Sequence, residues 1–235
     1  MLIDLHMHSS GASRCCRISF SDGLVAAREV GLDGVALTNH YQKNYMQKLN
    51  LTLEELIERY QVEYDRARPI AETAGMPFFF GIEVTMELYK RVHMLIYGLG
   101  PELLEEHPLM FDYTQEALYR AVHERGGILV QAHPYRNGSL LMDPQWMDGV
   151  ELNCHPLYGD IYLPEILAAA KQHHLPLTCG GDYHADTYRP KCGMYLPDDL
   201  RDTRDLADYI RTAKHTRLCV QDVGGEPFDL EYEIP

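Results

Sequence analysis

Two histidines separated by one residue stand near the start of the chain, in the stretch Leu-Ile-Asp-Leu-His-Met-His at residues 2–8. Side chains alternate between the two faces of a β-strand, so in a strand His6 and His8 would point the same way. Two imidazole nitrogens on one face can bind a single metal ion. The spacing alone is weak evidence, because an exposed strand can carry alternate histidines without binding anything.

Further histidines and carboxylates stand at or near the ends of short apolar runs. With the first pair, the candidates are His6, His8, His40, Glu83, His93, His133, Asp182 and His184. Asp182 and His184 repeat the two-residue spacing, which again places both side chains on one face. Imidazoles with carboxylates favour catalytic Zn, Mn or Fe ions that keep open positions for water, whereas structural zinc favours clustered cysteines.

The elements that must position these residues can be predicted from apolar patterns. We expect strands over residues 2–8, 34–40, 78–84, 92–98, 128–133, 149–154 and 177–184, and helices over residues 22–30, 52–74, 113–125, 164–174 and 200–214. Ser21 or Asp22 would cap the first helix, and Pro69 should kink or split the second. This alternation predicts an α/β architecture with a largely parallel sheet, in which chemistry collects at the carboxyl ends of the strands.

Only a short segment separates the strands over residues 78–84 and 92–98. A parallel crossover needs about a dozen residues or more, so we expect these two strands to pair antiparallel. This topology would bring His93, at the start of one strand, next to Glu83, near the end of the other.

Composition is that of a soluble globular protein. The 235 residues are 46% hydrophobic and 24% charged, and no apolar run is long enough to cross a bilayer. This length suits one sizeable core, so we expect a single domain over residues 1–235. The first residues lack the basic segment and long apolar stretch of a signal peptide, and we expect a cytoplasmic location.

The charge and the cysteines limit the partners. A formal net charge of −14 argues against general nucleic-acid binding, so an anionic substrate would be bound locally by metal ions or a few arginines. The cysteines are scattered without a Cys-x-x-Cys pattern, so we expect reduced thiols at Cys15, Cys16, Cys154, Cys179, Cys192 and Cys219. No feature indicates an oligomeric state.

Six motifs resemble those of the PHP family, the polymerase and histidinol phosphatase superfamily of metal-dependent phosphoesterases. They are Asp-Leu-His-Met-His at 4–8, Leu-Thr-Asn-His at 37–40, Gly-Ile-Glu-Val at 81–84, Val-His-Met-Leu-Ile-Tyr-Gly at 92–98, Ala-His-Pro-Tyr-Arg at 132–136 and Gly-Asp-Tyr-His at 181–184. They follow the family order over most of the chain. The resemblance implies a distorted seven-stranded (β/α)7 barrel, similar to a TIM barrel, with two or three divalent ions (Mn, Zn or Fe) in its mouth.

The resemblance also implies ligand sets for two of these ions. Glu83 would bridge them, and the full sets would be His6, His8, Glu83 and Asp182 for the first and Glu83, His93 and His133 for the second.

A third family site would match His40 and His184 with one residue from the loop after His8. The sequence departs from the family there, because the matching position falls near Arg14, Cys15 and Cys16. Either Cys15 or Cys16 supplies a thiolate, or the third ion is weak or absent.

Such a cluster could hydrolyse a phosphate ester. Water that bridges two cations loses a proton near neutral pH and attacks phosphorus, while the cations neutralise the growing charge. In this hypothesis Glu83 and Asp182 hold the ions, Arg14 and Arg136 bind the phosphate, and His184 protonates the leaving oxygen.

Three functions stay open. The first is a phosphomonoesterase or phosphodiesterase acting on a small phosphorylated metabolite or nucleotide, with histidinol phosphate as one candidate. The second is a hydrolase that uses the same ions on a cyclic amide or similar carbonyl. The third is a non-catalytic metal-binding module, against which the near-complete ligand set counts.

A few residues near the expected site have more than one interpretation. Glu151 and His155 belong to the strand over residues 149–154 or follow it, on the side that faces the site. Asp4 shares a face with His6 and could orient an imidazole, but an ordinary buried hydrogen bond fits as well.

Overall fold

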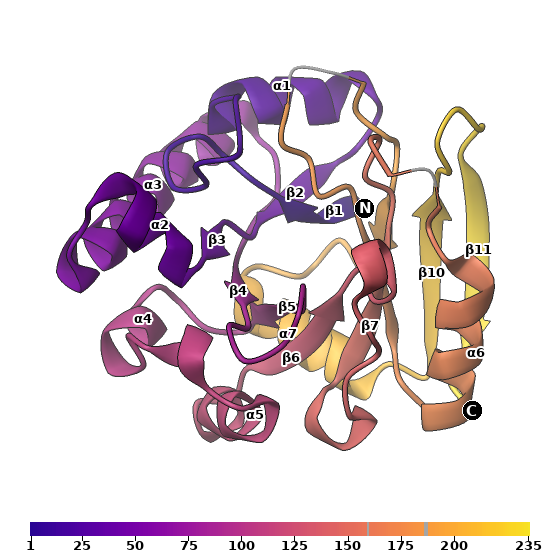
Figure 1. Cartoon of the computed structure of the whole chain (residues 1–235). Coiled ribbons are helices and arrows are strands. Elements are labelled where there is room, and N and C mark those ends of the chain that lie inside the picture. Colours follow the sequence, from indigo (N-terminus) through magenta and orange to yellow (C-terminus); the bar gives the residue numbers. More distant parts are fainter. Residues whose placement is uncertain (159, 186–187) are drawn as a thin grey trace.

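The structure is a computed structural model that describes residues 1–158, 160–185 and 188–235. In these residues the strands form one mixed sheet whose hydrogen-bonded order is β11-β10-β9-β1-β2-β4-β5-β6-β7-β8, with the short β3 paired to β4. Helices surround this sheet on several sides (Figure 1).

The strands that curve into a barrel run in one direction, with one exception. They are β1 (Leu2–Met7), β2 (Gly34–Leu37), β4 (Phe78–Thr85), β6 (Ile128–Ala132), β7 (Gly149–Asn153) and β8 (Leu177–Gly180). The exception, β5 (His93–Tyr97), is antiparallel to both β4 and β6. Tyr183, beyond β8, forms a parallel bridge with Met7 of β1, so the barrel is nearly closed.

The remaining strands extend this barrel. β3 (His40–Tyr41) follows β2 and pairs in parallel with the end of β4. β9 (Gly193–Tyr195), β10 (His215–Val220) and β11 (Phe228–Glu233) add an antiparallel layer to the edge of β1. In Figure 1 β10 and β11 lie at the right-hand side, next to α6 (Leu163–His173).

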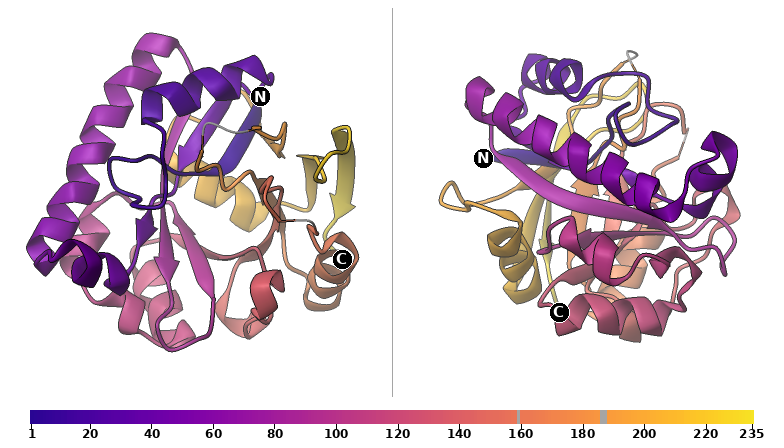
Figure 2. Two further views of the ribbon diagram at one scale, coloured as in Figure 1. Left: turned by 45° about the horizontal axis from the view of Figure 1, so that its top comes forward. Right: turned by 90° about the vertical axis from the view of Figure 1, so that its left-hand side faces the viewer.

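The other helices are α1 (Phe20–Glu29), α2 (Lys43–Leu49), α3 (Leu53–Ala74), α4 (Glu102–Glu106), α5 (Gln115–Glu124) and α7 (Thr203–Thr212), with short 3-10 helices at Met110–Asp112, Arg136–Gly138 and Pro144–Trp146. Figure 2 shows the long α3 beside α1 on one flank of the molecule. α7 packs on β4 and β5, where Thr203 Oγ1 donates to the carbonyl of Phe80 near the start of β4. This places α7 at the amino-terminal end of β4, away from the ends that carry Glu83 and its neighbours.

The capping of α3 is readable from its sequence. Thr52 accepts a hydrogen bond from the Glu55 amide while the Glu55 side chain accepts one from the Thr52 amide, and Gly75 ends the helix in a left-handed conformation. Pro69 was predicted to kink or split this helix, and the split is wrong, since α3 runs as one helix of 22 residues that contains Pro69. Pro69 lies on the exposed face together with Asp65, so water can bind the carbonyl that loses its partner.

Apolar packing fixes the strands that carry the site. Leu24 and Ala27 of α1 pack with Ala67 and Ala71 of α3 over Val35 of β2. A larger cluster fills the rest of the fold and includes Leu5, Ile82, Leu95, Val130 and Leu152, each at most 1% exposed. Each large apolar side chain buried in this way contributes about 1.5–3 kcal/mol, so the strand ends have little freedom to move.

The predicted α/β architecture is confirmed as a mixed α/β fold with a nearly closed barrel-like sheet, and the predicted antiparallel pairing of β4 with β5 is confirmed. The seven-stranded (β/α)7 detail is not matched, because the sheet of the described residues has 11 strands. The strand β11 was not predicted, because its mostly exposed, acidic residues lack the apolar pattern of a buried strand.

The predicted cap of α1 is wrong by two or three residues. The helix begins at Phe20, and Ser19 caps it by accepting a hydrogen bond from the Asp22 amide. Phe20 is only 2% exposed, so its packing in the core makes the helix begin at this residue, earlier in the chain than predicted. None of the helices in the described part of the chain has both the length and the apolar composition to cross a membrane.

Candidate metal centre

The candidate ligands converge at one rim of the barrel. His6 and His8 lie at the end of β1, Glu83 lies near the end of β4, and His133 directly follows β6. Asp182 lies two residues beyond β8. Because these strands share one direction, their carboxyl ends meet at the same rim. The antiparallel β5 brings in a further ligand at its start, where its first residue pairs with Thr85 at the end of β4.

Four buried side chains form the tightest group in this rim. His8 Nε2 lies 3.1 Å from His6 Nε2, 3.0 Å from Asp182 Oδ1 and 3.4 Å from Glu83 Oε2. His6 Nε2 lies 3.4 Å from Asp182 Oδ1 and 3.5 Å from Glu83 Oε1. A tetrahedral ion with ligands at about 2.0–2.1 Å would hold them roughly 3.3–3.4 Å apart. The group therefore has the spacing of a metal site.

Glu83 also meets imidazoles on its other side. Its Oε1 lies 2.8 Å from His93 Nδ1 and 3.1 Å from His133 Nε2, and its Oε2 lies 2.5 Å from His40 Nδ1. His40, Glu83 and His93 lie within ligand distance of one another. This differs from the predicted grouping, in which His40 belonged only to a third ion. A carboxylate with imidazoles on both sides is suited to bridge two ions.

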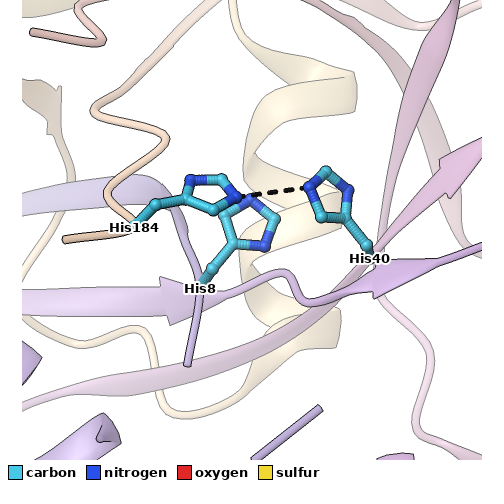
Figure 3. Close-up of side chains that lie close together, drawn as sticks. All are labelled: His8, His40 and His184. Atoms are coloured by element: carbon cyan, nitrogen blue, oxygen red, sulfur yellow. Dashed lines mark hydrogen bonds between the residues drawn. The ribbon is translucent and has the colours of Figure 1, made fainter. Parts of the chain in front are cut away.

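A third group of imidazoles lies beside the first. His184 Nε2 is 3.3 Å from His40 Nε2 (Figure 3). The ring of His8 lies beside both, with its centroid 4.0 Å from that of His184 and 4.3 Å from that of His40. Cys15 lies next to these rings. Burial raises the pKa of its thiol, but hydrogen bonds from His184 and His40 outweigh burial and lower it to about 5.

Of the two cysteines predicted near the third ion, only Cys15 is brought to the imidazoles in the described structure. Its Sγ lies 3.1 Å from the hydroxyl of Tyr45 at the rim of the cavity. Cys16 is buried in a small cluster with Ile18 and Tyr183, where its thiol donates to the Ile18 carbonyl. The two residues therefore differ in environment although they are adjacent in the sequence.

Outer partners orient the imidazoles, and sequence reasoning did not identify their roles. Glu151 Oε1 lies 2.8 Å from His6 Nδ1, and Ser13 Oγ lies 3.0 Å from His8 Nδ1. A partner at Nδ1 leaves the Nε2 lone pair free for an ion. Asp4, in contrast, accepts from the backbone amides of His6 and Gly181, so it supports the strand ends rather than an imidazole ring.

The pKa values of the carboxylates and of His6 in this group are shifted far from their usual values. Burial raises the pKa of Glu83 and of Asp182, but nearby imidazoles outweigh burial and hold both well below the usual range. Burial lowers the pKa of His6, but Glu151, Asp182 and Glu83 outweigh it and raise it well above the usual value. Buried carboxylates thus need positive charge, which protons or metal cations can supply.

Two buried oxygens fit the same interpretation. Glu83 Oε2 and Asp182 Oδ1 have no hydrogen-bond partner of acceptable geometry within the described residues. An unpaired buried oxygen is costly, and a bound cation is one way to satisfy it. His133 at φ 31° and Asp182 at φ 48° also adopt left-handed backbone conformations, which are uncommon for non-glycine residues.

A cavity of about 430 Å³ opens onto these ligands. Its wall includes Arg91, Arg136, His155 and Tyr158. Arg14, predicted to bind phosphate, is exposed and does not line this cavity; Arg91 takes that place. No sequence pattern indicated Arg91, because its place in the cavity wall depends on the path of the loop before β5, where its backbone is left-handed at φ 59°.

Arg136 occupies the predicted place but is already bonded. Its Nη1 donates to Asp182 Oδ2 at 2.6 Å, its Nη2 donates to Asn153 Oδ1, and its guanidinium lies 4.3 Å from the Tyr158 ring centroid. Two of its donors are therefore committed to protein acceptors. This arrangement lets Arg136 position Asp182 as well as add positive charge to the cavity wall.

His155 also faces the cavity, as a neutral donor. Its Nδ1 accepts a hydrogen bond from the Leu157 amide, so the proton of the neutral ring is on Nε2. Burial lowers the pKa of His155 to about 4, and the positive charge of Arg136 adds to the effect against the opposing charge of Asp182. His155 is thus an uncharged N–H group at neutral pH.

Several solved structures share the fold of this chain. It matches a candidate metal-dependent phosphoesterase from Bifidobacterium adolescentis with a TM-score of 0.58 at 18% identity, over 90% of this chain and 96% of that one. It matches PsfC from Pseudomonas syringae with a TM-score of 0.61 at 19% identity, over 94% and 91%.

A third solved structure has the same fold. It is an amidohydrolase from Chromobacterium violaceum with bound sulfate and no metal, matched with a TM-score of 0.61 at 16% identity, over 88% of this chain and 96% of that one. No protein-family model matches the sequence, and no curated protein matches it. At these identities the similarity is one of fold.

Proposed function

We propose that this protein is a metal-dependent phosphoesterase of the PHP type that hydrolyses a small phosphorylated metabolite or nucleotide. The observation that carries the proposal is the buried group of His6, His8, Glu83 and Asp182. In this group the Nε2 atom of each imidazole lies 3.0–3.5 Å from an oxygen of each carboxylate. His93 and His133 on the other side of Glu83 would hold a second ion. Mn, Zn or Fe suits this set of nitrogen and oxygen ligands.

Two features of the structures that share this fold support phosphate as the substrate. One structure with this fold is a candidate phosphoesterase, and the amidohydrolase was crystallised with sulfate, which resembles phosphate in shape and charge. The cavity of about 430 Å³ suits a small molecule, and the net charge of −14 disfavours a nucleic-acid polymer. We propose that residues 1–235 form one catalytic unit with a small phosphorylated substrate as its partner.

Metal ions bound here would supply a hydroxide near neutral pH and neutralise phosphoryl charge. Arg136 holds Asp182 in place, and Glu151 holds His6. Arg91 and the Nε2–H of His155 face the cavity and would bind phosphoryl oxygens.

His184 would donate a proton to the leaving oxygen. In the metal-free protein burial lowers its pKa, but the charge of Asp182 and a hydrogen bond with Cys15 outweigh burial and raise it. A third ion on His40, His184 and Cys15 would take this role away from His184. The proton-donor role therefore belongs to a centre with two ions.

The substitution Glu83→Gln tests the proposal because it removes the bridging charge and keeps the volume. We expect loss of bound metal and a fall in p-nitrophenyl phosphate hydrolysis by more than about 100-fold. Glu72→Gln on the exposed face of α3 is the matched control and should change neither. Full metal content and rate in the Glu83→Gln variant would contradict the proposal.

A carbonyl substrate is the second candidate function, favoured by the fold match to an amidohydrolase. The same ions could direct hydroxide at carbon instead of phosphorus. A panel of metabolite monoesters that includes histidinol phosphate, the bis-ester of p-nitrophenyl phosphate, and cyclic amides would separate the two. Turnover of amides alone by the metal-loaded protein would favour the second function.

A further inference from the structure

Three of the six cysteines converge outside the candidate metal centre. Cys154 directly follows β7, Cys179 belongs to β8, and Cys192 directly precedes β9. Their Sγ atoms all lie within 4.8 Å of one another, and Cys154 Sγ is 3.8 Å from Cys179 Sγ. The three side chains are 1%, 0% and 0% exposed. We call this group the thiol cluster.

The thiol cluster lies on the face of the barrel wall opposite to the candidate metal centre. Side chains alternate along β7, so Glu151 and Asn153 face the centre while Cys154 faces the other way. On that other face Cys179 donates to the carbonyl of Cys219 in β10, at 3.4 Å. The cluster is therefore enclosed between the ends of β7 and β8 and the layer formed by β9 and β10.

The composition of the thiol cluster selects a class of ligand. Three sulfur atoms without a carboxylate or imidazole among them favour a thiophilic d¹⁰ ion, whereas the centre at the rim offers only harder nitrogen and oxygen ligands apart from Cys15. A tetrahedral zinc ion with Zn–S distances of about 2.3 Å holds its sulfurs roughly 3.8 Å apart. The Cys154–Cys179 separation has this value.

The surroundings also favour a thiolate. The backbone amide of Gln221 donates to Cys154 Sγ at 3.5 Å. The Cys154 and Cys179 thiols also lie within hydrogen-bonding distance of each other. A bound cation would replace the thiol protons.

We propose that Cys154, Cys179 and Cys192 form a second metal site, which binds a thiophilic d¹⁰ ion such as Zn²⁺. Binding releases the protons of the three thiols and forms three metal–sulfur bonds, with no change of oxidation state. The ion joins the ends of β7 and β8 to the segment before β9. Because the sulfurs are buried, the ion binds during folding and exchanges slowly, so its role is structural.

The test uses cadmium as the probe, since the ¹¹³Cd resonance moves strongly downfield with each thiolate ligand. The parent protein carries Cys15→Ser, which removes the thiol beside the other centre, and is produced in medium that contains ¹¹³Cd. We expect one thiolate-rich resonance in addition to any signal from nitrogen and oxygen ligands. The variants Cys154→Ala, Cys179→Ala and Cys192→Ala should lose it, together with one bound ion per chain.

Cys219→Ala is the matched control, because this buried thiol donates to the Lys191 carbonyl and is not part of the thiol cluster. It should keep the resonance. Absence of a thiolate-rich signal in the folded parent protein would overturn the proposal, even if the cluster variants fail to fold. Survival of the signal in a folded Cys179→Ala variant would overturn it as well, and would identify the cysteines as ordinary core residues.

Discussion

Two buried carboxylates, Glu83 and Glu151, contact the imidazoles at the rim of this barrel in different ways. Glu83 is fully buried and contacts imidazoles from β1, β3, β5 and the end of β6, so removal of its charge would leave several rings without a partner. Glu151 contacts the Nδ1 atom of His6, on the side of the ring that faces away from the other ligands, so it would affect a bound ion only through His6. The two residues should therefore differ in how strongly their substitution affects metal binding.

Glu151→Gln tests the outer role. Loss of the carboxylate at His6 Nδ1 should weaken metal binding by about 10–100-fold, because an outer carboxylate raises the basicity of the imidazole and fixes its orientation. Isothermal titration of the metal-free protein measures this change. The exposed Glu124→Gln variant should bind as the wild type does, and equal affinities for all three proteins would contradict the assigned role.

The raised pKa of His6 predicts that metal affinity depends on pH. In the metal-free protein this imidazole keeps its proton at neutral pH, because Glu151, Asp182 and Glu83 outweigh burial. A metal ion must displace that proton, so affinity should rise as pH increases between about pH 6 and 8. Titrations in buffers with different heats of ionisation measure the protons released. Binding without proton release, or with proton uptake, would contradict the prediction.

The segment after β8 carries two of the candidate ligands, Asp182 and His184. Its far end is attached to β1 by Arg189, whose Nη2 donates to Asp4 Oδ2 at 2.7 Å and whose Nη1 donates to the Gly23 carbonyl. The Arg189 and Asp4 side chains are only 2% and 0% exposed. Asp4 in turn accepts from the Gly181 amide, so one buried ion pair joins both ends of the segment to β1.

Arg189→Met should therefore destabilise the fold. It leaves Asp4 buried without its cation, which typically costs about 3–5 kcal/mol of unfolding free energy. Urea denaturation at neutral pH measures the loss. Arg217→Met removes a half-exposed pair with Asp229 and should cost at most about 1 kcal/mol. A similar small loss at Arg189 would show that the buried pair does not hold the segment.

At the scale of the whole molecule, the metal centre and the fold should depend on each other. Buried carboxylates and imidazoles from strands across the barrel converge at one rim, so ions bound there stabilise the native state over the unfolded chain. A free ion at about 100 times its dissociation constant adds roughly 2.7 kcal/mol.

Metal removal measures that coupling. We expect a chelator to lower the midpoint of thermal unfolding and readdition of Mn²⁺ or Zn²⁺ to restore it. The Glu83→Gln variant should respond much less to either treatment, because it binds less metal. Identical midpoints for metal-loaded and metal-free wild-type protein would contradict the coupling of the centre to the fold.

Residue types and local spacing were enough to predict the ligand candidates and the strands that carry them. His6 and His8 lie on one face because strand periodicity is a local property. Asp182 and His184 reach the same site by another route, because the strand predicted over residues 177–184 ends at Gly180 in β8 and Asp182 has a left-handed backbone at φ 48°. Local apolar patterns were also enough to predict the alternation of strands and helices, including the long helix over residues 52–74. A short connection was also enough to predict the antiparallel β5, and with it the position of His93 next to Glu83.

Only the tertiary structure decided which side chains meet. In the folded chain His40 contacts Glu83, and Arg136 donates a hydrogen bond to Asp182. Arg91, and not Arg14, lines the cavity. The thiol cluster forms on the other face of the barrel wall. These contacts join residues from different strands and loops, and each depends on the curvature of the sheet and the path of a loop. Local sequence patterns do not predict these contacts. They indicate on which face of a strand a side chain lies, but not which residues from other elements pack against it.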